Sequence, residues 1–349
     1  MEVKSSELYS VQDFDKVPKI DGHVHYYTTD PIFIEYARQR NMRYISINVD
    51  FKDAGWPEKE EQLAISQYFI KEAPDVFAFI GAVPMCDPYS SICMSGVSAY
   101  IQHVLKIGAI GVKIWKNVGM KLRTENRLLM IDHPEFKGLL DFLEDKKIPL
   151  LGHFGEPKNC WLPLEEMTVN SDIKYFTKNP DYHMYLHPEL PGYEAQIEAR
   201  DNMLRQHPDL PFVGAHLASC EWSVDEIAAR LDSYPNMMVD LAERVCHLQH
   251  QCIENYDKVR QFMIDFQDRL IYASDIIHFT DETYGEQIEE VKHRWESQWH
   301  FFTQGDLQTT WQVNGEFRGL ALPKEVIDKI YFHNAFIAYP RLKYQFLPA

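Results

Sequence analysis

Two histidines separated by one residue stand in the segment KIDGHVHYY, which spans residues 19–27. In a β-strand, residues i and i+2 point to the same face, so the imidazoles of His23 and His25 would lie side by side. Neutral imidazole nitrogens are frequent ligands of divalent metals. The spacing therefore predicts two ligands of one metal site, if other segments of the chain supply the remaining ligands.

Other apolar runs also end in residues that bind metals or transfer protons. These are Lys113 and Lys116 in GVKIWKN, His153 in LLGHFGEP, His216 in FVGAHLAS and Asp275 in IYASDII. Taken alone, a histidine at a strand end is more often a hydrogen-bonded structural residue, an aspartate often caps the following helix, and a lysine often extends its stem over apolar surface. Their common position at strand ends favours a shared metal-binding active site.

The elements that would position these residues alternate along the whole chain. Short apolar runs typical of strands cover residues 19–25, 44–49, 76–83, 110–115, 148–153, 212–216, 237–241 and 270–274. Helical patterns cover residues 31–41, 58–72, 97–107, 134–145, 193–206 and 224–231, and the last of these follows the capping-box pattern SVDE. These β-then-α units predict an α/β fold, the closed (β/α)8 TIM barrel with parallel strands inside and helices outside.

An open, doubly wound sheet is the alternative fold, but it would require a glycine-rich phosphate-binding loop after the first strand, where the sequence has none. In a barrel, the side chains at the C-terminal ends of the strands meet at one mouth. We expect one domain over residues 1–349, with long insertions after the fifth and eighth strands, at about 154–192 and 275–322. Connections of this length are often functional lids.

The composition excludes several classes of partner. The chain has 349 residues, of which 45% are hydrophobic and 25% charged, as in ordinary soluble globular proteins. Its net charge of −17 argues against binding to nucleic acids or anionic membranes, because both are polyanionic. The six cysteines form no CxxC pair, which argues against a disulfide framework and a zinc finger. The sequence shows no signal-peptide pattern and no apolar run long enough to span a membrane, so we expect a cytoplasmic protein. We also expect it to act on a small-molecule substrate, and a homo-oligomer would be ordinary for this fold.

The sequence resembles the amidohydrolase superfamily of metal-dependent TIM-barrel enzymes, and within it amidohydrolase family 2, the branch that includes aminocarboxymuconate-semialdehyde decarboxylase. The resemblance covers essentially the whole chain and rests on His23-x-His25, His153, His216, Asp275, the segment DLAER at 240–244 and the segment YFHNA at 331–335. It implies that His23, His25, His153 and Asp275 bind a divalent metal, and that His216 is either a second-metal ligand or a base beside the metal. Two-metal members use a carboxylated lysine on strand four, a position that Lys113 or Lys116 would fill, so the number of ions stays open.

Imidazoles with a carboxylate suit Zn²⁺ best, with Mn²⁺ or Fe²⁺ as substitutes. Such a metal lowers the pKa of bound water to about 7, and Asp275 would accept the water proton, which predicts hydrolysis of a small amide, ester or lactone. The same groups, with His216 delivering a proton to carbon, would serve a non-oxidative decarboxylase. A metal-free lactonase or a non-catalytic barrel that only binds its ligand would also be compatible with these residues.

Further residues are candidates for substrate binding. Arg244 follows the seventh strand, and its forked guanidinium suits a substrate carboxylate, although a surface ion pair would also explain it. Glu156 could orient a ligand or the substrate. The insertion at 159–194 contains His183 and His187 among aromatic residues and prolines, which is typical of a lid or of a subunit contact. Trp115, just beyond the fourth strand, would line the same pocket.

Overall fold

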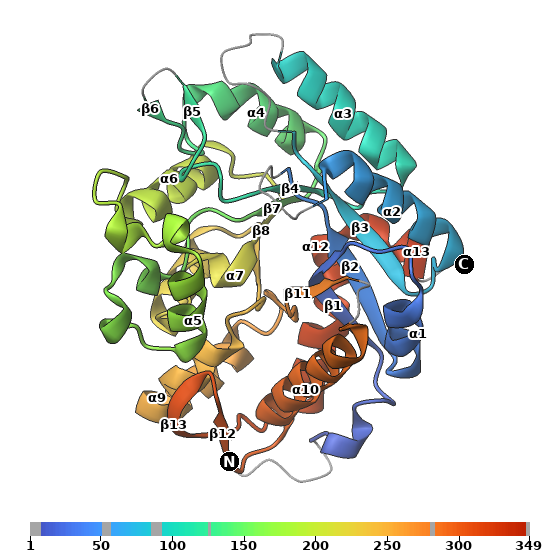
Figure 1. The fold of residues 1–349 in the computed structure, drawn as a ribbon, viewed down its shortest axis with the longest axis vertical. Helices are drawn as coiled ribbons and strands as arrows, with labels where there is room; N and C mark the ends of the chain where they lie inside the picture. The colour runs from blue at the N-terminus through green and yellow to red at the C-terminus, as the bar shows by residue number, and fades with distance from the viewer. Residues whose placement is uncertain (1–7, 51–56, 85–92, 125–126, 280–282, 347–349) are drawn as a thin grey trace.

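The computed structural model of the chain describes residues 8–50, 57–84, 93–124, 127–279 and 283–346. Parallel strands form one curved sheet in the order β10-β9-β8-β7-β4-β3-β2-β1-β11 (Figure 1). Their bounds are β1 Lys19–Tyr26, β2 Met42–Ile47, β3 Phe77–Ala82, β4 Val112–Ile114, β7 Leu150–Gly152, β8 Phe212–Gly214, β9 Met237–Asp240, β10 Leu270–Ile271 and β11 Ile276–His278. Each expected apolar run overlaps one of these strands, and the TIM-barrel prediction is confirmed.

The sheet closes through the chain segment that carries β10 and β11. β10 pairs with β9, and β11 pairs with β1. Between these pairings, Gly22 N–H donates to Tyr272 O (2.9 Å) and Asp275 N–H donates to His23 O (2.8 Å). A Cβ atom at Gly22 would lie 2.8 Å from Ile271 Cγ2, so only glycine permits this close approach. Residues 276–278 therefore belong to the barrel, which corrects the expectation that the second insertion begins at 275.

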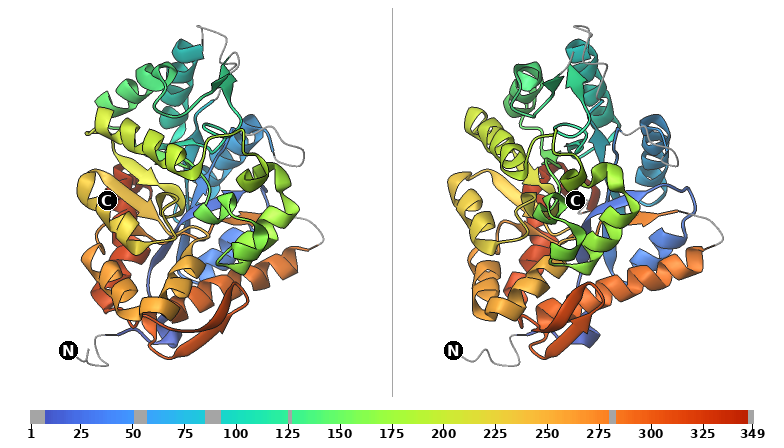
Figure 2. Two further views of the ribbon diagram at one scale, coloured as in Figure 1. Left: turned by 90° about the vertical axis from the view of Figure 1, so that its left-hand side faces the viewer. Right: turned by 60° about the vertical axis from the view of Figure 1, so that its left-hand side comes forward.

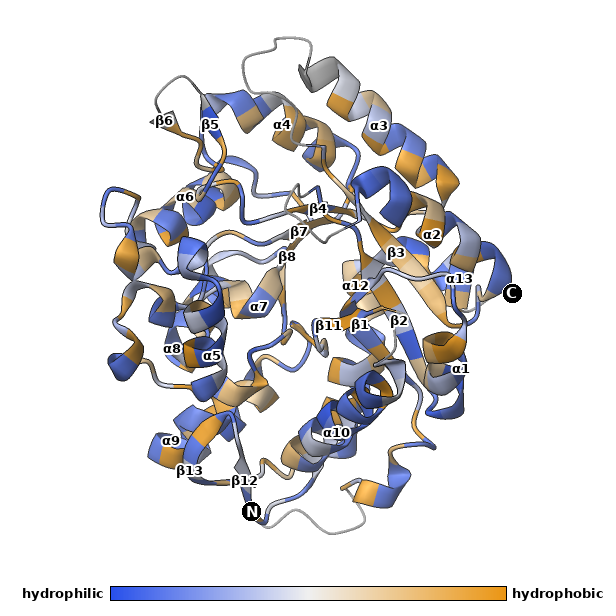
Figure 3. Cartoon of the chain, viewed as in Figure 1, coloured by the Kyte–Doolittle hydropathy of each residue, from blue (hydrophilic) through white to orange (hydrophobic). Residues whose placement is uncertain are grey.

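Alternate strand residues face two different apolar cores. Val24, Tyr26, Val112 and Ile114 belong to the core between the strands and the surrounding helices. The residues that alternate with these along the strands point into the barrel. They form a second cluster, which includes Ile45, Ile47, Ala78, Ile80, Leu151, Val213, Met238 and Ile271. Figure 3 shows the apolar strands at the centre of the molecule, inside amphipathic helices. The polar residues His25, His153 and Asp240 lie at or just beyond the C-terminal ends of β1, β7 and β9, which places them at the mouth of the barrel.

Helices surround the strands (Figures 1 and 2). Their bounds are α1 Ile32–Gln39, α2 Lys59–Glu72, α3 Cys93–Ile107, α4 Lys137–Asp145, α6 Tyr193–Gln206, α8 Val224–Ser233, α9 Val245–Asp265 and α10 Tyr284–Thr303. The hydroxyl of Ser223 caps α8 by accepting from Glu226 N–H at 3.4 Å, as the SVDE pattern predicts. Within the described part of the chain, no helix combines the length and apolarity needed to cross a membrane.

The C-terminal helices close the bottom of the barrel. They are α11 Lys324–Asp328, a π-helix at Lys329–His333, α12 Asn334–Ala338 and α13 Lys343–Phe346. Phe336 and Tyr339 join the interior core, and the amide of Asn334 donates to the carbonyls of Gln267 and Leu270, both at 2.7 Å. Because this end is plugged, a ligand reaches the interior from the opposite end.

Two insertions meet at that opposite end. The first, after β7, contains short 3-10 turns and α5 (Asn170–Lys178); the second contains α10 and the hairpin β12 (Leu307–Thr310) and β13 (Val313–Arg318). A further small hairpin joins β5 (Arg123–Thr124) and β6 (Arg127–Leu128). Asn170 N–H donates to Gln312 O (2.8 Å), and the Asn170 amide donates to Trp311 O (2.9 Å). These bonds attach α5 to the tip of the β12–β13 hairpin.

Candidate metal centre

Three side chains converge where β1 meets the segment between β10 and β11. Asp275 Oδ1 lies 3.4 Å from His23 Nε2 and 3.3 Å from His25 Nε2. One ligand atom from each of the three residues lies within 4.8 Å of the other two. Asp275 Oδ1 is buried and has no hydrogen-bond partner among the described residues. An unpaired buried carboxylate oxygen facing two imidazole nitrogens fits a divalent cation.

The two histidines are oriented by contacts behind them. His23 Nδ1 lies 2.8 Å from Asp240 Oδ2, and His25 Nδ1 lies 2.9 Å from Ile47 O. A carbonyl oxygen only accepts, so Nδ1 of His25 carries a proton and Nε2 presents its lone pair. The carboxylate of Asp240 favours the same tautomer for His23. Both rings therefore present an Nε2 lone pair to the centre, as metal-binding histidines do.

His216 lies at the start of an unusual turn directly after β8. Residues 216–219 all have φ between 55° and 59°. For residues other than glycine, this left-handed conformation costs roughly 1–2 kcal/mol each. Side chains hold the turn: Arg200 donates to Ala218 O, and the Tyr193 hydroxyl donates to Ser219 O at 2.6 Å. Such strain, held by surrounding structure, is typical of functional sites.

Asp240 connects His216 to His23. Its Oδ1 accepts from His216 N–H at 2.6 Å, while its Oδ2 contacts the ring of His23. The rings of His216 and His23 are 5.1 Å apart between centroids. His216 Nδ1 lies 3.0 Å from Ala242 O, so it donates and leaves Nε2 as an acceptor. Asp240 is thus a shared support for two candidate site histidines.

His153 lies beside His216 and outside the triplet of His23, His25 and Asp275. The rings of His153 and His216 are 4.3 Å apart, and His153 Nε2 is 3.6 Å from Glu156 Oε2. Burial, followed by the positive charges of nearby lysines, holds the pKa of His153 well below its ordinary value. The ring is therefore neutral and available as a ligand, and its assignment as one stays a prediction.

The structure distinguishes the two lysines near strand four. Because Val112 and Ile114 face the helices, Lys113 points into the barrel. Its ammonium group is buried and has no hydrogen-bond partner among the described residues. Burial lowers the pKa of Lys113 to about 8, although the negative charges of Asp240 and Asp275 act in the opposite direction. Lys116 instead forms an ion pair with Glu156 and donates to the Tyr175 hydroxyl at 3.0 Å. Burial lowers the pKa of Lys116, but Glu156 outweighs it, so the net shift is upward.

The carboxylates of the centre stay ionised in spite of their burial. Burial by itself would raise the pKa of Asp275, but His23 and His216 outweigh it and hold the pKa well below the ordinary range. For Asp240, burial is again the opposing effect, and His23 keeps its pKa below the ordinary value. The pKa of His23 is lowered, first by burial and then by Lys113. Two ionised carboxylates beside the imidazoles give the site the negative charge that a divalent metal balances.

A cavity of about 140 Å³ opens beside these groups. His153, His216 and Asp275 line it from the barrel, Tyr175 and Phe176 line it from α5, and Glu243 and Arg244 line it from the loop after β9. Arg244 is buried, and its Nε has no hydrogen-bond partner among the described residues. Its Nη1 lies 4.0 Å from Asp172 Oδ1, and the other oxygen of that carboxylate contacts His247 Nε2 at 3.1 Å. The cavity thus combines an aromatic wall with the guanidinium of Arg244, whose Nε–H is not used by the described residues.

Comparison with known proteins identifies the family of this chain. A model of the amidohydrolase family matches residues 20–341, which is nearly the whole chain. The chain belongs to amidohydrolase family 2. The resemblance inferred from the sequence is confirmed.

Solved structures share the fold of this chain at low sequence identity. An uncharacterised TIM-barrel protein from Bordetella bronchiseptica is 15% identical, with a TM-score of 0.55 over 93% of this chain and 99% of that one. A structure described as an amidohydrolase II is 16% identical, with a TM-score of 0.51 over 92% of this chain and 99% of that one. No curated protein matches the sequence.

Three of the substrate-binding candidates do not line the cavity beside the metal centre. His183 Nε2 contacts Leu162 O at 2.8 Å, and His187 Nε2 contacts Pro180 O at 3.1 Å. Trp115 packs against Tyr182, with ring centroids 6.1 Å apart. None of the three lines the cavity described above. Nε2 of His183 and Nε2 of His187 each contact a backbone carbonyl of the first insertion, and Trp115 packs against Tyr182 of the same insertion.

Some residues of the metal centre and of its cavity were not predicted from the sequence as site residues. Asp240 ends β9, and the rule that placed Asp275 at a strand end would also have selected it. Tyr175, Phe176 and Asp172 come from α5, inside the insertion. The sequence shows aromatic residues in this insertion, but it predicted neither the helix nor the face of that helix that meets the barrel.

Proposed function

We propose that the protein is a metal-dependent hydrolase of a small amide, ester or lactone that carries a carboxylate. One observation supports this most directly. His23, His25 and Asp275 surround one point at the mouth of the barrel, and Arg244 faces the adjoining cavity with unpaired donor capacity. A hydrolase of this class needs both a metal that activates water and a cation that holds the substrate.

The donor set fits the metal. His23 and His25 offer Nε2 lone pairs, and Asp275 offers a buried oxygen that has no hydrogen-bond partner among the described residues. Nitrogen and oxygen ligands of this kind suit Zn²⁺ first, then Mn²⁺ or Fe²⁺. When bound, such a metal lowers the pKa of water to about 7 and polarises a substrate carbonyl.

The protein's own residues then perform the remaining tasks. Asp275 accepts the proton of the attacking water and passes it to the leaving nitrogen or oxygen. His216, with Nε2 as an acceptor, contacts the reacting group or a second ion. Arg244 binds the substrate carboxylate through its guanidinium fork. Tyr175 and Phe176 of α5 restrict water, so that each electrostatic contact in the cavity is stronger than in bulk solvent.

A second candidate function is non-oxidative decarboxylation of a small carboxylic acid. The observation that favours it is that Arg244 and His216 line the same small cavity. A carboxylate held by Arg244 would place the adjoining carbon near His216, whose Nε2 would take up a proton from water and deliver it to the carbon that loses CO₂. The same metal centre would then orient the substrate.

The two reactions differ in what becomes of water and CO₂. The purified protein, depleted of metal by chelation and reloaded with Zn²⁺ or Mn²⁺, is incubated with small carboxylated amides, lactones and hydroxy acids in water labelled with heavy oxygen. Hydrolysis incorporates the label into the product carboxylate, whereas decarboxylation releases CO₂ and leaves the product unlabelled.

The controls are a variant within the centre and one outside it. His25→Ala should abolish turnover, whereas His187→Ala should not, because His187 lies away from the cavity. Full turnover by metal-free protein would contradict the proposal and favour a metal-free lactonase. Absence of both reactions across the panel would favour a barrel that only binds its ligand.

A further inference from the structure

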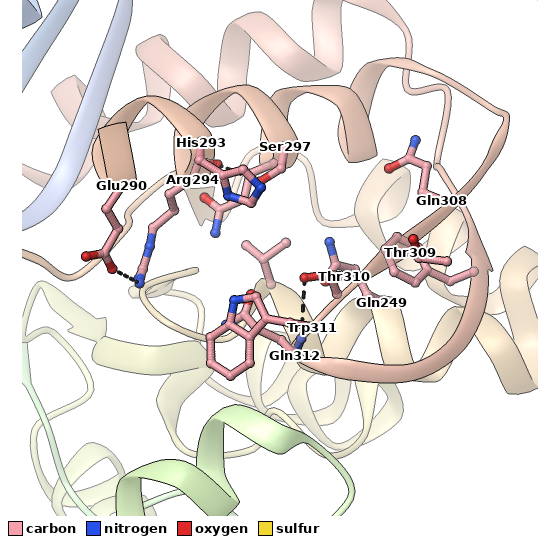
Figure 4. A pocket seen from close by; sticks show the side chains of 13 residues that line it. Gln249, Glu290, His293, Arg294, Ser297, Gln308, Thr309, Thr310, Trp311 and Gln312 are labelled. Carbon is pink, nitrogen blue, oxygen red and sulfur yellow. Dashed lines mark hydrogen bonds and ion pairs between the residues drawn. The ribbon is translucent and has the colours of Figure 1, made fainter. Parts of the chain in front are cut away.

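A second, larger cavity lies between α10, the hairpin β12–β13 and the start of α9 (Figure 4). Its volume is about 430 Å³, against about 140 Å³ for the cavity at the metal centre. Small-molecule sites commonly enclose about 300–1,000 Å³. No step proposed for the metal centre uses this second cavity, so its lining requires a separate explanation.

Amide and hydroxyl groups dominate the lining. Figure 4 shows Ser297 of α10 on one side of the hollow and Gln312 of the hairpin on the other. Gln249 of α9 is only 5% exposed, and its Oε1 has no hydrogen-bond partner among the described residues. Leaving a buried acceptor unpaired costs about 1–3 kcal/mol. An occupant that supplies an O–H or N–H donor would remove this cost.

The charged groups of the lining neutralise one another. Arg294 pairs with Glu243, lies 3.4 Å from Glu290, and donates to Ser274 O at 3.0 Å. Its guanidinium is therefore occupied by groups of the protein, unlike that of Arg244 in the metal-centre cavity. An anionic occupant could not form an ion pair with Arg294, because the carboxylates of Glu243 and Glu290 already pair with its guanidinium. The lining therefore suits a neutral molecule.

Trp311 supplies a flat apolar surface. It stands in the turn between β12 and β13, lines the cavity, and is 54% exposed. Two bonds hold the turn: Asn170 donates to Trp311 O at 2.9 Å, and Gln312 N–H contacts Thr310 Oγ1 at 3.4 Å. Lys174 Nζ lies over one face of the indole, 4.8 Å from the ring centroid, so the opposite face is the one that a ligand ring would stack against.

We propose that this cavity binds a neutral saccharide. The C–H face of a pyranose would stack on Trp311, while its hydroxyls donate to Gln249 Oε1 and exchange hydrogen bonds with the surrounding glutamine, serine and threonine side chains. A saccharide combines the three properties that the lining requires, namely no charge, many hydroxyl donors and one apolar face. The inference is independent of the reaction at the metal centre.

Saturation-transfer NMR with the full-length protein tests this site. The probes are methyl β-glucoside, maltose and cellobiose, each at millimolar concentration. We expect saturation transfer to the ring protons of at least one probe. Trp311→Ala should abolish the transfer, and Gln249→Leu, which removes the buried acceptor, should weaken binding about 10-fold.

Two further variants make the result specific. Trp311→Tyr keeps an aromatic surface and should retain binding. Trp222→Ala removes another exposed tryptophan, 38% exposed and outside the cavity, and should bind as the wild type does. Thermal unfolding of every variant establishes that it is folded. No transfer to any of the three saccharides, or transfer that persists in both Trp311→Ala and Gln249→Leu, would overturn the proposal.

Discussion

His23 Nδ1 and Asp240 Oδ2 lie 2.8 Å apart in a fully buried pair that joins β1 to β9 across the barrel mouth. The contact fixes the tautomer of His23 and makes its Nε2 the atom that faces Asp275. The other oxygen of Asp240 accepts from His216 N–H, so one carboxylate positions two histidines of the centre. This relationship leads to the first prediction.

Asp240→Asn should weaken metal binding about 10- to 100-fold, because the amide no longer stabilises the Nδ1–H tautomer of His23 as a carboxylate does. Competition with a coloured chelator measures the change in affinity. Asp232→Asn, at an exposed aspartate, serves as the matched control. Unchanged metal affinity in Asp240→Asn would show that Asp240 does not support a metal ligand.

Asp275→Asn should separate metal binding from proton transfer. The amide oxygen can still ligate, but it cannot accept the proton of the attacking water, so kcat should fall on the order of 100- to 10,000-fold at saturating metal. Turnover and metal content are measured on the same sample. A metal-loaded Asp275→Asn protein with wild-type kcat would assign the proton transfer to another group.

Lys113 and Lys116 should differ in their effect on metal content. Lys113 points into the barrel without a hydrogen-bond partner among the described residues, so its amine is free to take up CO₂ and become a carbamate ligand. In bicarbonate buffer, mass spectrometry should find about two ions per chain in the wild type and in Lys116→Met, and about one in Lys113→Met. Equal metal content in all three proteins would exclude Lys113 as a ligand.

Arg244→Met should impair substrates that carry a carboxylate. Losing a hydrogen bond to a charged group costs about 1.5–3 kcal/mol, which corresponds to roughly a 10- to 100-fold lower kcat/KM. The methyl ester of the same substrate should be affected far less, because it carries no negative charge. Arg38→Met, at a half-exposed arginine that pairs with Asp75, is the control. Equal losses for acid and ester would argue against a carboxylate contact.

His278 should make folding stability depend on pH. It is fully buried among Tyr26, Phe33 and Tyr44, and neither ring nitrogen has a hydrogen-bond partner among the described residues. Burial, followed by His25, lowers its pKa from 6.5 to about 3. Between about pH 6.5 and 3, the His278 ring is therefore protonated in the unfolded chain but not in the folded protein. The free energy of unfolding falls as the pH drops through this range.

His278→Phe tests this dependence. For metal-free protein, the free energy of unfolding of the wild type should fall relative to that of the variant by about 1.4 kcal/mol for each pH unit below 6.5. Urea unfolding at about pH 7 and about pH 5 measures the difference. Metal is removed from both proteins, because protonation of the metal ligands at low pH would release the metal and change stability for a separate reason. Parallel stability curves for the two proteins would contradict the assignment.

Much of the barrel follows from local patterns. The apolar runs predict the strands because a strand buried on both faces needs nearly continuous apolar residues. The i, i+2 spacing places His23 and His25 on one face for the same geometric reason. Asp240 was accessible to the same argument, since it also ends a strand.

Other features depend on contacts between distant segments. Both lysines near strand four fit the pattern, and only the packing of Val112 and Ile114 against the helices shows that Lys113 points inward. His183 and His187 have the composition of substrate-binding residues, but the turns of the first insertion use their ring nitrogens. The aromatic wall made by Tyr175 and Phe176 likewise depends on how α5 docks against the hairpin.

The sequence by itself determined eight strands, six of the surrounding helices (α1, α2, α3, α4, α6 and α8), the family and the spacing of the β1 histidines, because these depend on periodicity and spacing within short segments. It did not predict the helices α5, α9 and α10. Only the tertiary structure decided which lysine faces the centre, that Asp240 joins His23 to His216, and that Arg244 and α5 share one cavity. Those relationships join residues far apart in the chain, and they depend on strand register, barrel closure and the docking of insertions, none of which has a local sequence signal.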